Sequence, residues 1–558
     1  MRFCIIALIL VVFAGMSPQA VADDAAADGT VVVTLKGSFP LVAQPSLWSP
    51  MQMDMTLHEA SELLRRAFRA PERRVVLDLS QGFMPSLAAA EALADTLRRR
   101  PDDIKVVCLV EQVGDAAFVV AAQADEVVMA QGGMLFVGGL SLNIDHYRDL
   151  LDSVGVRFTA ITSGPQKIAP EPLTQSQPSP EALAEYRELL QGLDTQLRQA
   201  TVRGDFDEDF LRAARARNPQ TARAALDLGL VDRLVEPSTF FADQPQPLRH
   251  LSEGPDIPDL ESFAGIMQLW RQLLQGEPRQ RHNQVVAVVH LEGMIVDGDV
   301  GLTSGQVSAE ALRKLCQRLA DDPSVVAVVL RINSGGGSVS AADRMYHSIR
   351  KLDEHKPVVA LLDSAAASGG YYIAMGARAI VAHQHTITGS IGVFMVLPDL
   401  SSMRDKLGVH RTTIRTDPGA DLLSTNTLTD AQREALQSVV AEIDQGFQEL
   451  VGQRRDLDAE AVAALADGRV FTGVQAHALG LVDSVGALPD AVALARAQAD
   501  IAQPLPLQIH PRNPGLLGLL GMGPQAALPA QVRGLVQSAR RQQDQPWFLM
   551  WHGVPQLR

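Results

Sequence analysis

Two halves of this sequence repeat one another at a nearly constant distance. Three pairs of segments match in the same order: "VVTLKG" at 32–37 with "VVHLEG" at 288–293, "VLDLSQG" at 76–82 with "VLRINSG" at 329–335, and "LGLVD" at 228–232 with the same letters at 479–483. The members of the pairs lie 256, 253 and 251 residues apart. So steady a spacing predicts a tandem duplication, with one copy at 30–240 and the other at 284–490.

The pattern within each copy predicts an α/β fold. In the second copy the apolar run "SVVAVVLRI" is followed by the helical pattern "AADRMYHSIRKLDEHK" and then by another apolar run, "PVVALLD". Continuous apolar strands that alternate with helices are typical of a sheet covered on both faces. We therefore expect two copies of a unit built from stacked ββα or βαβ elements.

The segments outside the two copies have a different character. Residues 241–283 contain a Pro-rich stretch and then the amphipathic "FAGIMQLWRQLLQ", which predicts a linker followed by a connecting helix. Residues 491–558 include a Pro/Gly-broken tail with apolar patches such as "GLLGLLGM" and "WFLMW". Packing of this tail on the body is the default expectation, and contact with a partner or with the membrane is the alternative.

Residues 1–22 have the features of an export signal. Arg2 precedes fourteen residues without a charge, and a small-x-small site follows at Ala20-Val21-Ala22. Fourteen apolar residues are fewer than the roughly twenty that a spanning helix needs. A cleaved signal is the first interpretation and an uncleaved anchor the second. Either one places the mature chain outside the cytoplasm, in the cell envelope.

Composition and cysteine content narrow the class of protein. The formal net charge of −15 is spread along the chain without a basic stripe, so we expect no nucleic-acid partner. Cys4 lies in the export segment, while Cys108 and Cys316 have apolar neighbours, which favours buried free thiols over the alternative of one disulfide. The "HQH" at His383–His385 has no third metal ligand nearby. We therefore expect no metal site, and a metal bound at this motif is the weaker alternative.

The two copies differ at one short stretch, "SAAASGGYYIAMGA" at 364–377. At an offset of 253 residues, Ser368 corresponds to Asp115, and the Gly-rich "NSGGGSVS" at 333–340 corresponds to "SQGFMPSL" at 80–87. Consecutive glycines let a backbone approach a ligand and direct N–H groups toward it. A helix that begins near Ser368 would favour an oxyanion there. Ser368 is therefore either a nucleophile or a small residue at a close backbone contact.

A serine nucleophile needs a base. His347, His383, His385 and His410 do not form a recognisable triad pattern. The other available base is a lysine whose pKa burial has lowered from about 10.4 toward about 7.

The first copy supplies such a lysine, Lys167 in "TSGPQKIAPEP", at a position where the second copy has Ala420. The serine occurs only in the second copy and this lysine only in the first, which predicts one composite site shared by both copies. The alternative is an exposed loop lysine that pairs with the nearby Glu171.

These motifs together resemble the long form of the signal peptide peptidase A family, also called protease IV. The resemblance covers about 30–490 and is carried by "NSGGGSV", "AASGGYYIA", "TGSIGV", "GRVFTGVQAHALGLVD" and, in the first copy, "GPQKIAPEP". It implies a tandem crotonase/ClpP-like fold and a serine endopeptidase that cleaves signal-peptide remnants and other apolar peptides at the periplasmic side of the inner membrane. It also implies a homo-oligomer, a tetramer, that needs no cofactor.

The resemblance also assigns roles to residues. Ser368 matches the family's nucleophile, Lys167 its general base, and Ser390 of "TGSIG" the serine that hydrogen-bonds the lysine. Whether Ser368 and Lys167 meet within one chain or across a subunit boundary stays open in the sequence.

The oxyanion-hole motif of the family is matched less completely in this sequence. Gly336 and Gly337 match the glycines of the family's oxyanion loop, and the amide of Gly369 is expected as a second donor. The family usually has Ser-Pro-Gly-Gly where this chain has Ser334-Gly335-Gly336-Gly337. The missing proline predicts a looser loop.

Two other functions fit the same fold. A crotonase-like acyl-transfer enzyme acting on acyl-CoA is disfavoured by the export signal, because CoA is a cytoplasmic cofactor. A non-catalytic envelope scaffold is disfavoured by the presence of Ser368, Lys167 and Ser390, because an inactive copy would have drifted, as the first copy did at Asp115.

Overall fold

The computed structural model describes residues 29–41, 55–201, 208–251, 282–299, 301–302, 305–417 and 419–511. The segment predicted as signal or anchor, most of the predicted linker and connecting helix, and the tail beyond residue 511 lie outside the described residues. Across the described ranges, no helix combines the length and the apolar character needed to cross a membrane.

The first copy is a mainly parallel sheet in the order β6-β4-β3-β2-β1-β8, with β7 paired to β4. Its strands are β1 (Thr30–Thr34), β2 (Arg74–Asp78), β3 (Lys105–Gly114), β4 (Glu126–Phe136), β6 (Gln220–Thr221), β7 (Arg233–Val235) and β8 (Leu248–Leu251). Its helices are α2 (Leu57–Phe68), α3 (Leu87–Arg98), α4 (Asp115–Ala121), α5 (Arg148–Val154), α6 (Glu171–Thr174), α7 (Pro180–Thr201), α8 (Glu208–Arg215), α9 (Ala222–Asp227) and α10 (Pro237–Phe240).

The second copy repeats this topology in the order β17-β15-β13-β12-β9-β19, with β14 paired to β13 and β18. Its strands are β9 (Val285–Glu292), β10 (Met294–Val296), β11 (Gln306–Ser308), β12 (Val325–Ser334), β13 (Val358–Ala367), β14 (Ala379–Ala382), β15 (Ile387–Gly389), β17 (Val470–Thr472), β18 (Ser484–Val485) and β19 (Leu507–His510). Its helices are α12 (Ala309–Asp321), α13 (Val339–His355), α14 (Gly369–Ala374), α15 (Ser401–Lys406), α16 (Asp430–Arg455), α17 (Ala459–Leu465), α18 (Gly473–Ala478) and α19 (Leu488–Gln498). The matching strand orders confirm the predicted tandem α/β duplication.

Valine-rich strands form the centre of each sheet because both of their faces are covered. In β9, Val285 and Val289 pack into the cluster that includes α12, α13 and α14, whereas Val286 and Val288 point to the opposite face, which α19 covers. Burial of each such side chain contributes about 1.5–3 kcal/mol. This two-sided burial explains why the strands are continuous apolar runs and not alternating ones.

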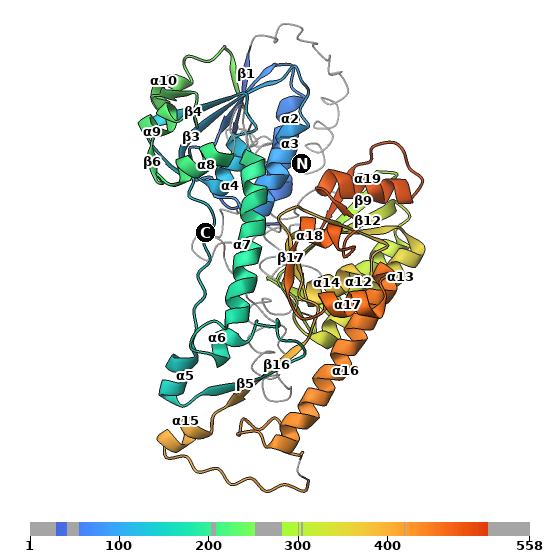
Figure 1. Cartoon of the computed structure of the whole chain (residues 1–558). Helices are drawn as coiled ribbons and strands as arrows, with labels where there is room; N and C mark the ends of the chain where they lie inside the picture. Colours follow the sequence, from blue (N-terminus) through green and yellow to red (C-terminus); the bar gives the residue numbers. More distant parts are fainter. Residues whose placement is uncertain are drawn as a thin grey trace, which may run out of the picture.

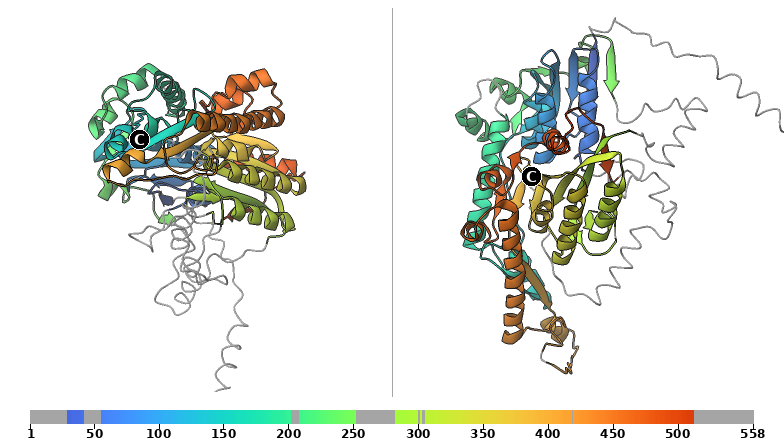
Figure 2. Two further views of the ribbon diagram at one scale, coloured as in Figure 1. Left: turned by 90° about the horizontal axis from the view of Figure 1, so that it is seen from below. Right: turned by 90° about the vertical axis from the view of Figure 1, so that its right-hand side faces the viewer.

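The two copies are joined at the lower end of the molecule by a shared ribbon (Figure 1). There β5 (Arg157–Thr162) of the first copy pairs antiparallel with β16 (Phe394–Asp399) of the second. The long helices α7 and α16 extend toward this end, as two further views also show (Figure 2). The ribbon brings the loop after β5 to the second copy.

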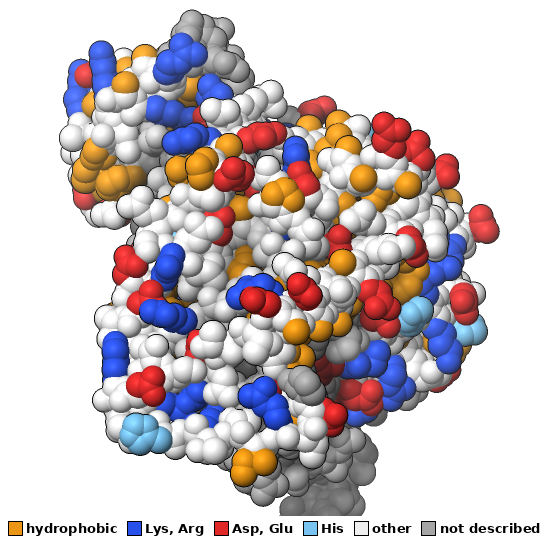
Figure 3. Space-filling model, turned by 60° about the horizontal axis from the view of Figure 1, so that its bottom comes forward, with side chains coloured by type: hydrophobic (Ala, Val, Ile, Leu, Met, Phe, Trp, Pro, Cys, Tyr) orange, Lys and Arg blue, Asp and Glu red, His pale blue; other side chains and the backbone are white. Residues whose placement is uncertain are grey.

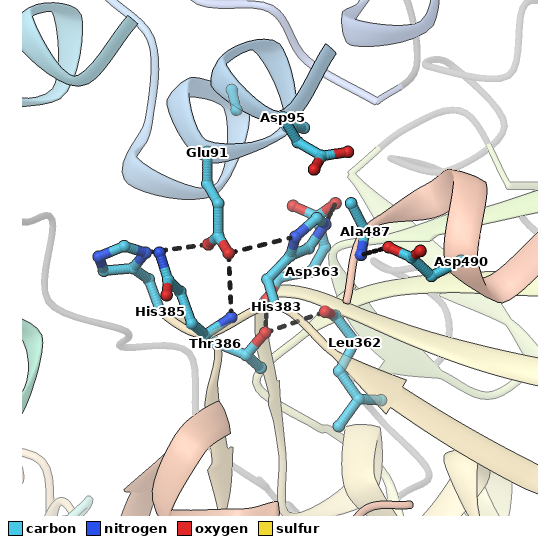
Figure 4. A network of polar contacts seen from close by, with 12 residues as sticks. Glu91, Asp95, Leu362, Asp363, His383, His385, Thr386, Ala487 and Asp490 are labelled. Atoms are coloured by element: carbon cyan, nitrogen blue, oxygen red, sulfur yellow. Dashed lines mark hydrogen bonds and ion pairs between the residues drawn. The ribbon is translucent and has the colours of Figure 1, made fainter. Parts of the chain in front are cut away.

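A buried polar cluster also connects the copies (Figure 4). Glu91 of α3 reaches the turn before β15, where its carboxylate lies 2.9 Å from His385 Nδ1. His383 is fully buried, 4.0 Å from both Glu91 and Asp363, and Asp363 in turn pairs with Arg331 at 2.5 Å. These two histidines thus lie at the interface between the copies, away from Ser368, and the turn that carries them leads into the strand before Ser390.

Cys108 and Cys316 are both buried, and no disulfide joins them. Cys108 lies in β3 and Cys316 in α12, so each belongs to a different copy. Burial raises the pKa of the Cys316 thiol to about 12. The alternative of a disulfide between them is therefore wrong.

Candidate active site

Ser368 lies at the junction between β13 and α14, in a strained conformation. Its φ and ψ are 52° and −117°, which is rare for a residue with a side chain. The Ser368 N–H donates to the Gly389 carbonyl at 2.8 Å, and the Ser368 carbonyl accepts from the Tyr372 N–H at 2.8 Å. Strain held by surrounding contacts is common at functional sites.

The equivalent position in the first copy holds a carboxylate. Asp115 begins α4 directly after β3, just as Ser368 precedes α14 after β13. The carboxylate accepts the N–H groups of Gly138 and Gly139, at 3.0 Å each, and lies 3.5 Å from Arg215. The first copy therefore has the same junction, and its side chain is engaged in structural contacts.

Lys167 follows β5 and reaches into the second copy. Its side chain is buried, with 3% of the residue exposed, and Nζ lies 3.2 Å from Ser368 Oγ within the same chain. Nζ also donates to the carbonyl and the hydroxyl of Ser390, at 2.7 and 2.9 Å. The reading as an exposed loop lysine is therefore wrong. Glu171 instead accepts two hydrogen bonds from Ser179, at 3.0 and 2.6 Å.

Burial makes Lys167 a candidate base at neutral pH. Desolvation lowers the pKa of its ammonium group to about 7, against the opposing effect of the carboxyl groups of Asp444 and Glu185. A neutral amine has two N–H groups and one lone pair. Because Ser390 accepts at two positions, the lone pair is available to Ser368.

A segment of the second copy holds the lysine loop in place. A Cβ atom at Gly468 would lie 2.5 Å from the backbone nitrogen of Lys167, so only glycine fits there. The N–H of Gln166 donates to the carbonyl of Asp467 at 3.0 Å, and the N–H of Ser390 donates to that of Arg469 at 2.8 Å. Residues 467–470 therefore support both Lys167 and Ser390. The letters of this segment, "GRVFTG" at 468–473, do not by themselves indicate a role in the site.

The glycine loop lies against the serine. A Cβ atom at Gly336, whose φ is +110°, would lie 2.8 Å from the Gly369 nitrogen and 3.3 Å from Ser368 Cβ. Gly337 packs on Ile295, where a Cβ atom would lie 2.0 Å from the carbonyl oxygen. The loop is tied to Ile295 on both sides, since Ile295 N–H donates to Gly336 and Ser338 N–H donates to Ile295, each at 2.9 Å. These bonds restrain the loop despite the absent proline.

The structure therefore brings together all six residues that the sequence singled out. It adds four supporting residues: Gly468, Ser163, Glu185 and Asp444. Ser163 accepts the N–H of Val393 at 2.9 Å and lies next to Gly392, which in turn contacts the Lys167 side chain. Within the described ranges, no group of three His, Cys, Asp or Glu side chains is arranged to hold a metal ion.

Comparisons with known proteins identify a family and several relatives. The family model of peptidase family S49 matches residues 98–243 and 350–502. "Protease 4" of Haemophilus influenzae is 28% identical over 436 residues, 75% of this chain and 69% of that protein. "Putative signal peptide peptidase SppA" of Enterococcus faecium is 33% identical over 216 residues, 38% of this chain and 62% of that protein. A solved structure of a ClpP1 mutant from Listeria monocytogenes covers 38% of this chain and 94% of that chain, with 14% identity and a TM-score of 0.25.

Proposed function

The chain belongs to peptidase family S49 and is a serine peptidase, and we propose that Ser368 is its nucleophile and Lys167 its general base. The observation that carries this proposal is the 3.2 Å separation between Lys167 Nζ and Ser368 Oγ in a buried site. A scaffold that only binds partners would gain nothing from a buried lysine without a carboxylate in direct contact. Burying such a group costs stability, and the cost is explained if the neutral amine is used.

The proposed reaction is acyl transfer to serine followed by hydrolysis. Neutral Lys167 takes the proton of Ser368 as Oγ attacks the peptide carbonyl, and the resulting ammonium then protonates the leaving amine. Water next attacks the acyl-enzyme with Lys167 as the base, which releases the acid and restores Ser368. Ser390 orients the amine through its two acceptor oxygens.

We assign the oxyanion hole to the amides of Gly337 and Gly369. The N–H of Gly336 already donates to Ser334 Oγ at 3.2 Å. We therefore assign Gly336 the close backbone approach to Ser368 and Gly337 the hydrogen bond to the oxyanion. Gly369 is the first residue of α14, where the N–H groups of a helix start are not used within the helix. Each such donor contributes roughly 3–4 kcal/mol to transition-state stabilisation.

The substrates that we propose are apolar peptides, including remnants of signal peptides, in the cell envelope. The name of the Enterococcus faecium relative and the predicted export segment support this assignment. We place the enzyme on the periplasmic side of the inner membrane, where such remnants arise.

A serine-directed fluorophosphonate probe tests the nucleophile. We expect a single covalent adduct on the folded protein, which peptide mapping by mass spectrometry locates at Ser368. The adduct should form faster as the pH rises through about 7, because Lys167 then loses its proton. Folded protein that acquires no adduct, or an adduct at another serine, would favour the scaffold instead.

We further propose that the chain assembles head to tail with copies of itself. Gly155 packs tightly on α15, since a Cβ atom there would lie 2.5 Å from the Met403 nitrogen. Its counterpart 253 residues later, Gly408, has a similar left-handed conformation, with φ of +68° against +83°, but faces open space. The residue that corresponds to Met403 is Leu150, which is 64% exposed. A second copy of the chain can supply the missing contact.

The ribbon between the copies supports the same assembly. Within the chain, β5 pairs with β16 so that Thr162 lies opposite Phe394. The segment that corresponds to β5 in the second copy is 410–415, and the segment that corresponds to β16 in the first copy is 141–146. The same pairing between two chains would therefore join 410–415 of one chain to 141–146 of the next. Neither of these segments forms a strand within the chain. Ile414, in the second of these segments, is 94% exposed and therefore accessible to another copy of the chain. Figure 3, which brings this end of the molecule forward, shows isolated hydrophobic side chains among charges of both signs.

Disulfide cross-linking tests this interface. In the proposed register Leu142 of one chain faces Ile414 of the next, at the roughly 5 Å between Cα atoms that a disulfide can bridge. We expect the double variant Leu142→Cys/Ile414→Cys, in a Cys4→Ser background, to form covalent multimers on mild oxidation, whereas either single variant forms far fewer. A monomeric mass in light scattering, without cross-links, would contradict the assembly.

A further inference from the structure

Two buried carboxyl groups that the proposed reaction does not use act on Lys167, and each comes from a different copy. Glu185 lies on α7 of the first copy and Asp444 on α16 of the second. They are 9% and 6% exposed, and both interact electrostatically with the lysine. Buried carboxyl groups are costly unless they are paired, so their presence beside a lysine needs an explanation.

Glu185 has one oxygen engaged and one without a hydrogen bond. Oε1 accepts the N–H of Val470 at 2.9 Å, whereas Oε2 is buried and has no hydrogen-bond partner among the residues that the structure describes. Val470 pairs with Gly389, the residue before Ser390. Through Oε1, Glu185 therefore holds the strand that supports Ser390.

Asp444 touches the other side of the lysine loop. Its Oδ2 accepts the side-chain N–H of Gln448 at 2.6 Å, and its carboxyl group also interacts with the hydroxyl of Ser163, four residues before Lys167. Glu185 and Asp444 thus act electrostatically on Lys167 from helices of different copies. Their hydrogen bonds are made to Val470 and Gln448.

We propose that Glu185 and Asp444 are positioning residues that set the proton affinity of Lys167, so that the charge on either carboxylate controls the pH at which the site becomes active. This inference rests on the proposed role of Lys167 as the base. A nearby negative charge favours the ammonium form, and low polarity strengthens the effect. Loss of either charge should therefore make Lys167 a free amine at lower pH.

The pKa values of the two carboxyl groups are themselves raised. Burial raises the pKa of Glu185 to about 7, with Asp467 acting in the same direction, while the Val470 N–H, Arg469 and Lys167 oppose the rise. Tyr186 is the other titratable neighbour of Glu185. Burial likewise raises the pKa of Asp444, against hydrogen bonds from Ser163 and Gln448 and the charge of Lys167. The protons of the three groups are therefore coupled.

The test is the pH dependence of kcat/KM for Glu185→Gln and Asp444→Asn, measured on an apolar peptide from about pH 5 to about pH 9. Each amide keeps an oxygen that can accept the existing hydrogen bond but removes the charge. In each variant, we expect the acidic limb of the pH profile, where kcat/KM rises with pH, to move about half a pH unit to one pH unit toward lower pH. The rate near pH 6 then rises about 3- to 10-fold relative to the plateau at high pH. The exposed Glu181→Gln on the same helix is the control and should leave the profile unchanged.

Acidic limbs that stay in place in both folded variants, or move toward higher pH, would overturn the inference. A rate that falls equally at every pH would also overturn it, because that is the mark of a purely structural role. If Glu185→Gln fails to fold, Asp444→Asn carries the same test. Lys167→Met in the same assay distinguishes failure of the proposed base from failure of this inference. If Lys167→Met is as active as the wild type, Lys167 is not the base. If Lys167→Met is inactive but the pH profiles of Glu185→Gln and Asp444→Asn do not shift, only the role of the two carboxyl groups is wrong.

Discussion

Replacement of Ser368 by alanine is expected to lower kcat for peptide hydrolysis by about 10⁴-fold or more, with the fold intact. Without Oγ no acyl-enzyme can form, and the remaining oxyanion donors give only a small acceleration over water. Alanine fits the site, because it removes one oxygen from a residue that is 4% exposed and adds no volume. Steady-state kinetics together with circular dichroism measures both parts of the prediction.

Ser364 supplies a matched control for this variant. It lies on the same strand, β13, and its hydroxyl donates a hydrogen bond to the neighbouring Asp363 at 3.3 Å. Ser364→Ala should therefore keep kcat within about threefold of the wild type. A Ser368→Ala protein that folds and still hydrolyses peptide at a rate near the wild type would remove Ser368 from the reaction.

Replacement of Lys167 by methionine should have two opposite effects. Loss of the base should lower kcat by about 10²- to 10⁴-fold and slow fluorophosphonate labelling in proportion. Stability should rise, because methionine fills a similar volume without a buried charge. Unfolding transitions and labelling rates measured on one preparation test both effects. The exposed Lys351→Met is the control and should change neither.

The pH dependence of stability has a definite sign for this lysine. The folded pKa of about 7 lies below the ordinary value of 10.5, so the unfolded chain binds the additional proton between these limits. Wild-type stability should therefore rise with pH from about 7 to about 10.5, and the penalty below pH 7 is on the order of 5 kcal/mol. The gain in Lys167→Met should be largest at or below neutral pH and should fade as the pH rises. A stability difference between the methionine variant and the wild type that stays the same from about pH 7 to about pH 10 would contradict the lowered pKa of Lys167.

Much of the fold could be predicted because its signals are local. The runs around Val286 and Val329 mark strands buried on both faces, and the helix Val339–His355 buries residues at helical spacing. The repeat then predicts that both copies adopt the same topology. The histidines His383 and His385 are an example of residues whose contacts could not be predicted from the local sequence. Their pattern suggested only a weak metal site, and their actual partner, Glu91, lies almost three hundred residues earlier in the chain.

The sequence by itself determined the two-copy architecture, the strands of each sheet and the pair of residues, Ser368 and Lys167, that differ between the copies. Only the tertiary structure decided the state of that pair. It brings together two side chains that are 201 residues apart, excludes water from the lysine, and places Glu185 and Asp444 beside it. Periodicity records which face of an element is buried, whereas proton affinity depends on the distances and desolvation of groups from many elements at once. Those quantities exist only after the two copies have packed.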